Sequence, residues 1–166
     1  FVLLNILVLI INILDFDFLF ISHHLPEDVT YSQFVHQGIG ALIFSIVMSV
    51  LIILFYFRGG INFSKDNKLI KSLAYLWIIQ NVIMLISTSM RNGMYINEYG
   101  LTYKRIGVFI YLLLTAIGLV ATSIKIAKYK TASFLIRINS WLFYFVLVIS
   151  CFVNWDMFIT NYNIKH

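Results

Sequence analysis

The sequence has few charged residues and only one cysteine. Asp, Glu, Lys and Arg make up 11% of its 166 residues, whereas they make up about a quarter of an average soluble domain. The cysteine, Cys151, lies inside an apolar run and cannot form a disulfide within the chain, so we interpret it as a small buried apolar side chain. These scarcities argue against a soluble globular domain and against a scaffold held together by disulfides.

Apolar residues dominate the chain instead. They account for 61% of it, and the mean hydropathy is +0.90. Apolar runs of about 20 residues recur, and each is long enough to cross a hydrocarbon layer about 30 Å thick. The runs are continuous rather than alternating, which argues against a transmembrane barrel. We predict one all-α domain over residues 1–166, an integral membrane bundle of five transmembrane helices at about 1–21, 37–57, 69–90, 106–126 and 135–154, followed by a short interfacial helix over 155–166.

The first predicted span carries four polar residues, Asn5, Asn12, Asp15 and Asp17. Residues 1–14 lack the cleavage pattern of a signal peptide, and we expect a span whose beginning lies before Phe1. Acids near the end of a span are costly unless they face water, a partner or the bundle interior. Three interpretations stay open: the helix ends early and both acids lie at the interface, the acids form a proton or cation site, or they form a structural ion pair.

A polar link over 22–29 and the turns after it contain several possible metal ligands, including His23, Glu27 and His36. Their spacing matches no known zinc pattern, so we predict a solvated loop with no metal and no cofactor. Thr30 and Gln33 form a capping box, which predicts a helix from about residue 31 to 57 whose first turns stand in the headgroup zone.

Polar residues of the third predicted span gather on one side of a helical wheel. The opposite side is Leu, Ile and Val, and lipid cannot satisfy polar groups, so this wedge must face the bundle. The wedge contains Trp77, Gln80, Asn81, Met84, Ser87, Thr88, Arg91 and Asn92. The fourth span has a matching stripe at Tyr111, Thr115, Gly118 and Thr122. We predict antiparallel neighbours that pack through these polar faces, either as simple packing contacts or as a functional interior.

Basic residues indicate the orientation. The turns at 58–72 and 125–137 hold eight Lys and Arg, against four on the other face. Because basic loops stay in the cytoplasm, we predict a bacterial inner-membrane protein with its N-terminus inside and its C-terminus outside. The net charge of +5 then reflects the basic residues that gather in the turns between spans. We expect no nucleic acid as a partner, because no basic face with interleaved aromatics lies outside the membrane.

The stretch from Arg91 to Arg105 is the candidate functional region, because it joins two spans and combines Arg, Tyr and Glu with a Gly turn. At least one of its arginines should make a bidentate pair with Asp15, Asp17, Glu98 or Asp156. The alternative is that both are free to bind an anionic ligand or a lipid phosphate. The predicted outer-face cluster is Tyr31, His36, Arg91, Tyr95, Glu98, Tyr99, Lys104, Arg105, Asn154 and Asp156. The predicted intramembrane polar set is Asp15, Asp17, Gln80, Asn81, Ser87, Thr88, Tyr111 and Thr115.

Four stretches carry a family resemblance: TYSQFVHQG (30–38), LAYLWIIQN (73–81), INEYGLTYKRIGV (96–108) and NWDMFITNYN (154–163). The chain resembles the bacterial multi-pass membrane family known as the domain of unknown function 4153/4173 group, in versions from Bacteroidetes. It resembles the C-terminal portion, since members are usually longer at the N-terminus. The resemblance supports the membrane topology and implies no catalytic residues.

Three classes of function are compatible with the sequence. The first is a non-enzymatic subunit, scaffold or sensor whose outer loops contact another membrane or periplasmic protein, with the lipid bilayer as its environment. The second is a transporter or channel component that uses the polar faces of the third and fourth spans. The third is a membrane enzyme acting on a lipid-linked or cell-envelope substrate. No nucleophile–base pair, phosphate loop or metal motif is visible, so we assign no catalytic residues.

Overall fold

The computed structural model describes residues 2–17 and 68–165, and within these ranges all regular structure is helical. The helices are α1 (Val2–Asp17), α3 (Lys68–Tyr99), α4 (Tyr103–Ala127), α5 (Ala132–Phe152) and α6 (Trp155–Lys165). The predicted second span at 37–57, together with Tyr31 and His36, lies outside the described residues.

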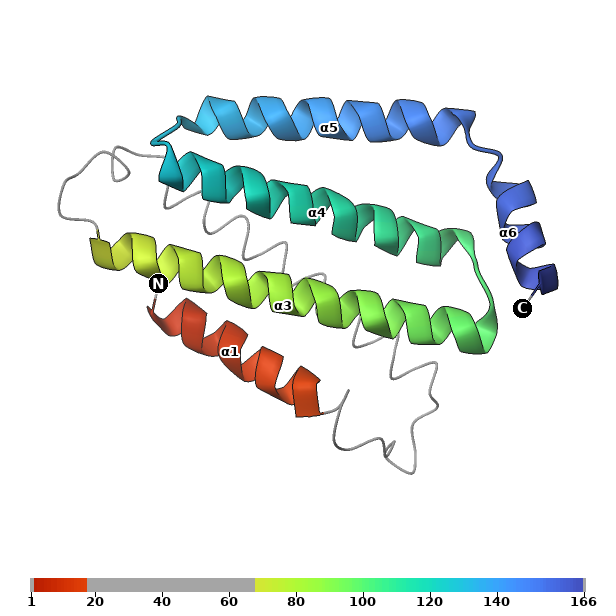
Figure 1. Cartoon of the computed structure of the whole chain (residues 1–166), viewed down its shortest axis with the longest axis horizontal. Helices are drawn as coiled ribbons and strands as arrows, with labels where there is room; N and C mark the ends of the chain where they lie inside the picture. Colours follow the sequence, from red (N-terminus) through yellow and green to blue (C-terminus); the bar gives the residue numbers. More distant parts are fainter. Residues whose placement is uncertain (1, 18–67, 166) are drawn as a thin grey trace.

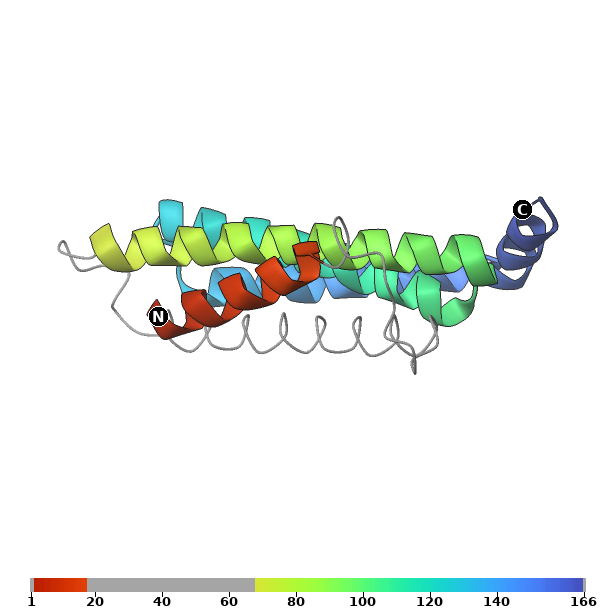
Figure 2. The ribbon, with the colours of Figure 1, turned by 90° about the horizontal axis from the view of Figure 1, so that it is seen from below.

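Three long helices lie side by side in the order α3, α4, α5 (Figure 1). Each turns back on the one before, so neighbours are antiparallel. The shorter α1 packs on the side of α3 away from α4 and is inclined to it (Figure 2). The C-terminal α6 lies across the end where α3 and α4 connect (Figure 1). We call this the hairpin end, and the end that holds the α4–α5 turn the basic end.

Three of the helices are long and apolar enough to cross a membrane: Lys71–Tyr99, Tyr103–Ala127 and Ser133–Phe152. The first predicted span forms the apolar helix α1, which has 16 residues in its described part. The described chain is therefore all-helical with three membrane-length helices, and the prediction of five spans goes beyond what it contains.

The connection between α3 and α4 is much shorter than the sequence suggested. Helix α3 continues to Tyr99, well beyond the predicted end at residue 90, so Arg91, Tyr95 and Glu98 belong to a helix rather than to a loop. Its 32 residues span about 48 Å, more than a hydrocarbon layer requires. The helix ends at Gly100, whose backbone φ of +78° lies in the left-handed region. Residues with a Cβ atom rarely adopt this conformation, so glycine is favoured here.

The core lies around α3. Val8 of α1, Trp77 and Met84 of α3 and Leu119 of α4 are fully or almost fully buried. Helix α5 covers α4 with one side and leaves most of its surface bare. Half of the most apolar stretch of α3 is buried, compared with 6% of that of α5. The polar groups of α3 are therefore held in the interior of the bundle.

Candidate functional site

A buried ion pair joins α1 to α3. The Nη2 group of Arg91 contacts Oδ1 of Asp15, and both side chains are 6% exposed. The hydroxyl of Ser87 donates to the other carboxylate oxygen, Oδ2. Ser87 and Arg91 lie one helical turn apart and therefore project from the same face of α3. An ion pair between an arginine of this region and an acid of another helix is thus present, as predicted. The expected bidentate geometry is not what these contacts show, because Arg91 contacts Oδ1 while Ser87 takes Oδ2.

Further polar contacts continue along the same line. The Nδ2 group of Asn5 donates to the backbone oxygen of Leu73 at 3.3 Å, and that of Asn12 donates to the backbone oxygen of Gln80 at 3.1 Å. Residues later in α1 contact residues later in α3, so the two helices run parallel to each other. We call this row the polar seam; it consists of Asn5, Asn12 and Asp15 of α1 with Leu73, Gln80, Ser87 and Arg91 of α3.

Three buried amide oxygens lie at and beside the seam. They are Oδ1 of Asn12, Oε1 of Gln80 and Oδ1 of Asn81, and none accepts a hydrogen bond within the described structure. The amide nitrogen of Asn81 donates to the backbone oxygen of Trp77 at 2.8 Å. The indole Nε1 of Trp77 is also buried and has no acceptor among residues 2–17 and 68–165. Such groups are costly in an apolar interior.

The helices α3 and α4 are neighbours, as predicted, but their polar faces do not satisfy each other. Thr115 and Thr122 donate to carbonyls of their own helix, those of Tyr111 and Gly118, at 2.9 and 2.8 Å. A threonine hydroxyl reaches the carbonyl four residues earlier without help from another helix. The side chain of Asn92 does reach α4, where it donates to the backbone oxygen of Arg105 at 3.1 Å. Ser87 and Arg91 of the wedge contact Asp15 of α1 instead.

Arg105 organises the hairpin end. Its guanidinium donates to the backbone oxygen of Gly100 and lies 3.9 Å from the ring centre of Tyr95 and 5.9 Å from that of Tyr99. The two tyrosine rings are 4.7 Å apart. Arg105 is only 8% exposed. Its charge is therefore used within the fold, to hold the α3–α4 connection closed.

Helix α6 is attached to this connection by side chains. Asn163 accepts from the backbone N–H of Leu101 at 2.7 Å and donates to the backbone oxygen of the same residue at 3.0 Å. The hydroxyl of Tyr103 donates to Asp156. Asn154 caps the start of α6 by accepting from the backbone N–H of Met157 at 3.1 Å. We call these contacts, together with those of Arg105, the clasp.

The clasp contains some residues of the predicted cluster and omits others. Tyr95, Tyr99 and Arg105 come together, and Asn154 and Asp156 take part from α6. Arg91 belongs to the polar seam instead. Glu98 and Lys104 are exposed. Of the predicted intramembrane set, Gln80, Asn81, Ser87, Thr88 and Asp15 are buried, Tyr111 and Thr115 are half-buried, and Asp17 is the last residue of α1.

Sequence reasoning missed two partners in the clasp, Asn163 and Tyr103. A single Asn that binds a distant backbone group leaves no pattern in a sequence. The cap at Asn154 could have been found, because Asn is a preferred residue immediately before a helix. Within residues 2–17 and 68–165, no three side chains among His, Cys, Asp and Glu come together in a way that could hold a metal ion.

A groove lies on α5, outside the seam and the clasp. It has a volume of about 380 Å³, and Arg137, Ser140, Trp141 and Tyr144 line it. These residues recur every three or four positions and therefore share one face of the helix. This groove holds the only positively charged group of the α5 helix.

Comparison with known proteins identifies a family and no closer relative. The family described as "Domain of unknown function (DUF4153)" matches residues 1–166. Comparison with curated proteins gives no match, and neither does comparison with solved structures.

Proposed function

The chain belongs to the DUF4153 family, and we propose that it is a non-enzymatic subunit, scaffold or sensor of the bacterial inner membrane. In this proposal it crosses the membrane five times, with its N-terminus inside. The hairpin end then faces outward and contacts another membrane or periplasmic protein. The basic turns and the three membrane-length helices support this topology.

The observation that carries the proposal is how the charged groups at the hairpin end are used. Arg91 is paired with Asp15, Arg105 is bound to Gly100 and stacked on Tyr95, and Asp156 accepts from Tyr103. An active site needs such groups to converge on a substrate. Here they fix helices to one another and leave a rigid surface on which Glu98 and Lys104 are exposed. A rigid surface with exposed polar groups suits the contact of one protein with another.

Orientation can be tested by labelling from one side of the membrane. Cysteines at positions 98 and 128, each in a Cys151→Ser background, should react with a membrane-impermeant maleimide from opposite sides. Position 98 should be labelled from the periplasm of intact cells and position 128 only after the cells are opened. Labelling of both positions from the same side would refute the topology.

The partner can be tested by photo-cross-linking in native membranes. A photoreactive phenylalanine analogue would replace Glu98 or Lys104 at the hairpin end and, as a control, Lys128 at the basic end. We expect a discrete protein adduct at positions 98 and 104 that is absent at position 128. Adducts with lipid alone at 98 and 104, or the same protein adduct at all three positions, would contradict a partner at the hairpin end.

A second candidate, a transporter or channel component, is favoured by the buried amide oxygens of Asn12, Gln80 and Asn81. Carbonyl-type oxygens are suitable ligands for a hard cation, and polar groups inside a membrane bundle are common on transport pathways. The test is ion flux into vesicles that contain the purified chain. A flux of Na⁺ or H⁺ that Asn81→Leu abolishes and Asn97→Leu leaves unchanged would support this candidate. The absence of flux above empty vesicles would eliminate it.

A further inference from the structure

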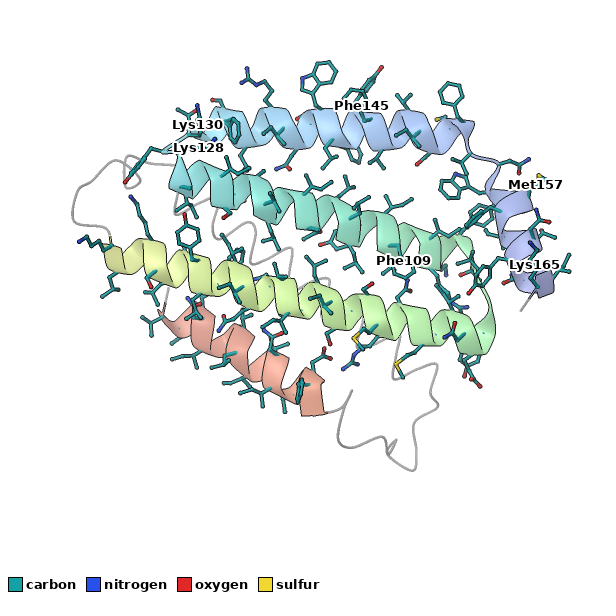
Figure 3. The ribbon with its side chains drawn as sticks, viewed as in Figure 1. Phe109, Lys128, Lys130, Phe145, Met157 and Lys165 are labelled. Atoms are coloured by element: carbon teal, nitrogen blue, oxygen red, sulfur yellow. The ribbon has the colours of Figure 1, made fainter. Side chains whose placement is uncertain are left out.

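The turn between α4 and α5, at the basic end of the bundle, is rich in positively charged side chains. Lys125, Lys128, Lys130 and Arg137 lie within thirteen residues, whereas residues 99–155 contain neither Asp nor Glu. Figure 3 shows Lys128 and Lys130 at the turn between α4 and α5, where α5 begins. Arg137 is exposed on α5 and lies about 8 Å along the axis from the start of this helix at Ala132. No carboxylate within residues 99–155 can therefore neutralise Arg137.

The groove on α5 begins at this arginine. Its volume is about 380 Å³, and it is lined by Arg137, Ser140, Trp141 and Tyr144. A guanidinium presents several N–H groups in a plane that matches the oxygens of a phosphate. The long stem lets it lie along the apolar helix while its charged head extends towards the headgroups. The groove therefore combines an anion-binding group with an aromatic wall.

Beyond the groove, the same side of α5 is aromatic and bare. The rings of Trp141 and Tyr144 are 6.0 Å apart, and those of Trp141 and Phe145 are 5.8 Å apart. All three side chains are more than half exposed, at 57%, 56% and 54%. Trp and Tyr are enriched where the hydrocarbon of a bilayer meets the headgroups. An acyl chain that extends from the groove would lie on this aromatic surface.

We propose that the α5 groove binds the headgroup of an acidic phospholipid. Arg137 binds the phosphate, Ser140 donates its hydroxyl to a headgroup oxygen, and Trp141 and Tyr144 pack against the glycerol and the first part of an acyl chain. Charge complementarity selects this occupant, because basic sites at the cytoplasmic ends of spans attract anionic lipids. An apolar helix of another protein would bury Arg137 without a counter-charge, which is unfavourable.

Lipid retention by the purified chain tests this proposal. The chain is released from nanodiscs of equal parts phosphatidylglycerol and phosphatidylcholine, and native mass spectrometry counts the lipids that stay bound. We expect one retained phosphatidylglycerol, and about tenfold weaker retention in Arg137→Gln, the loss typical of one charged hydrogen bond. Trp141→Ala should also weaken retention. Both side chains are exposed, so both variants should elute from a sizing column as the unaltered chain does.

Two controls decide between this site and other sources of binding. Lys165 is an exposed cation on α6, at the opposite end of the bundle (Figure 3), and Lys165→Gln should leave lipid retention unchanged. Glycerol phosphate at millimolar concentration should not displace the lipid, because it lacks acyl chains. The proposal is overturned if phosphatidylcholine is retained equally, if Lys165→Gln causes the same loss as Arg137→Gln, or if soluble phosphate empties the groove.

Discussion

Helices α3 and α5 are both apolar enough to cross a membrane, yet the structure uses them in opposite ways. Half of the most apolar stretch of α3 is buried, but only 6% of that of α5. Helix α3 turns Gln80, Asn81, Ser87 and Arg91 inward, whereas α5 carries most of its aromatic residues outward. In a bilayer, an apolar side chain packs about as favourably against lipid as against protein. The polar groups therefore decide which helix occupies the interior of the bundle.

The largest effect should follow when the buried ion pair of α3 is broken. Arg91→Met leaves the carboxylate of Asp15 buried without its counter-charge, which should lower the free energy of unfolding by about 3–5 kcal/mol. The double variant Asp15→Leu/Arg91→Met should recover most of this loss, because neither charge then remains. Unfolding of the purified chain in mixed detergent micelles measures both. A double variant as unstable as the single one would show that the pair is not the reason for the loss.

The two helices can be compared directly through a tryptophan in each. Trp77 of α3 is fully buried, and Trp141 of α5 is 57% exposed. Trp77→Ala should lower the free energy of unfolding by about 3 kcal/mol or more, because it leaves a cavity in the core. Trp141→Ala should change the free energy of unfolding by less than about 0.5 kcal/mol, as is usual for an exposed side chain. Equal losses for the two variants, measured in the same unfolding assay, would contradict the different roles of α3 and α5.

The clasp should give an intermediate effect. In Gly100→Ala, the new Cβ would lie 2.9 Å from Oδ1 of Asn163, and the backbone would keep an unfavourable φ of +78°. We expect Gly100→Ala to lower the free energy of unfolding by about 1–3 kcal/mol. The same substitution in an Asn163→Ala background removes the close contact and should cost less. A double-mutant cycle measures the difference. A cycle with no coupling would mean that Asn163 does not hold α6 to this connection.

The smallest effect should come from Tyr103→Phe. This change removes one exposed hydrogen bond to Asp156 and nothing from the core. The unfolding midpoint should stay unchanged, while limited proteolysis should release α6 faster, because one of its attachments is lost. Lys104→Met, next to it and also exposed, is the matched control for proteolysis. Slower release of α6, or faster release in Lys104→Met as well, would count against the clasp.

The sequence predicted the helical fold and the buried position of the polar wedge because both depend on local patterns of apolar and polar residues. It also predicted that an arginine would pair with an acid of another helix, since a charge at that depth needs a partner. It could not tell that Ser87 and Arg91 face α1 rather than α4, because a wheel gives the direction of a side chain but not the neighbour that lies there. The continuation of α3 to Tyr99 was missed because polar residues after Met90 resembled a loop.

The contrast between α3 and α5 is measured most directly by the oxygen accessibility of spin labels in a bilayer. Single cysteines would be placed at positions 79–86 of α3 and 141–148 of α5, in a Cys151→Ser background, and labelled with a nitroxide in nanodiscs. Oxygen concentrates in the hydrocarbon, so accessibility should oscillate deeply along α3, with Ile83 high and Met84 low. Along α5 it should stay high with only shallow minima. An oscillation in α5 as deep as that in α3 would contradict the assignment of α3 to the interior and α5 to the lipid-facing edge.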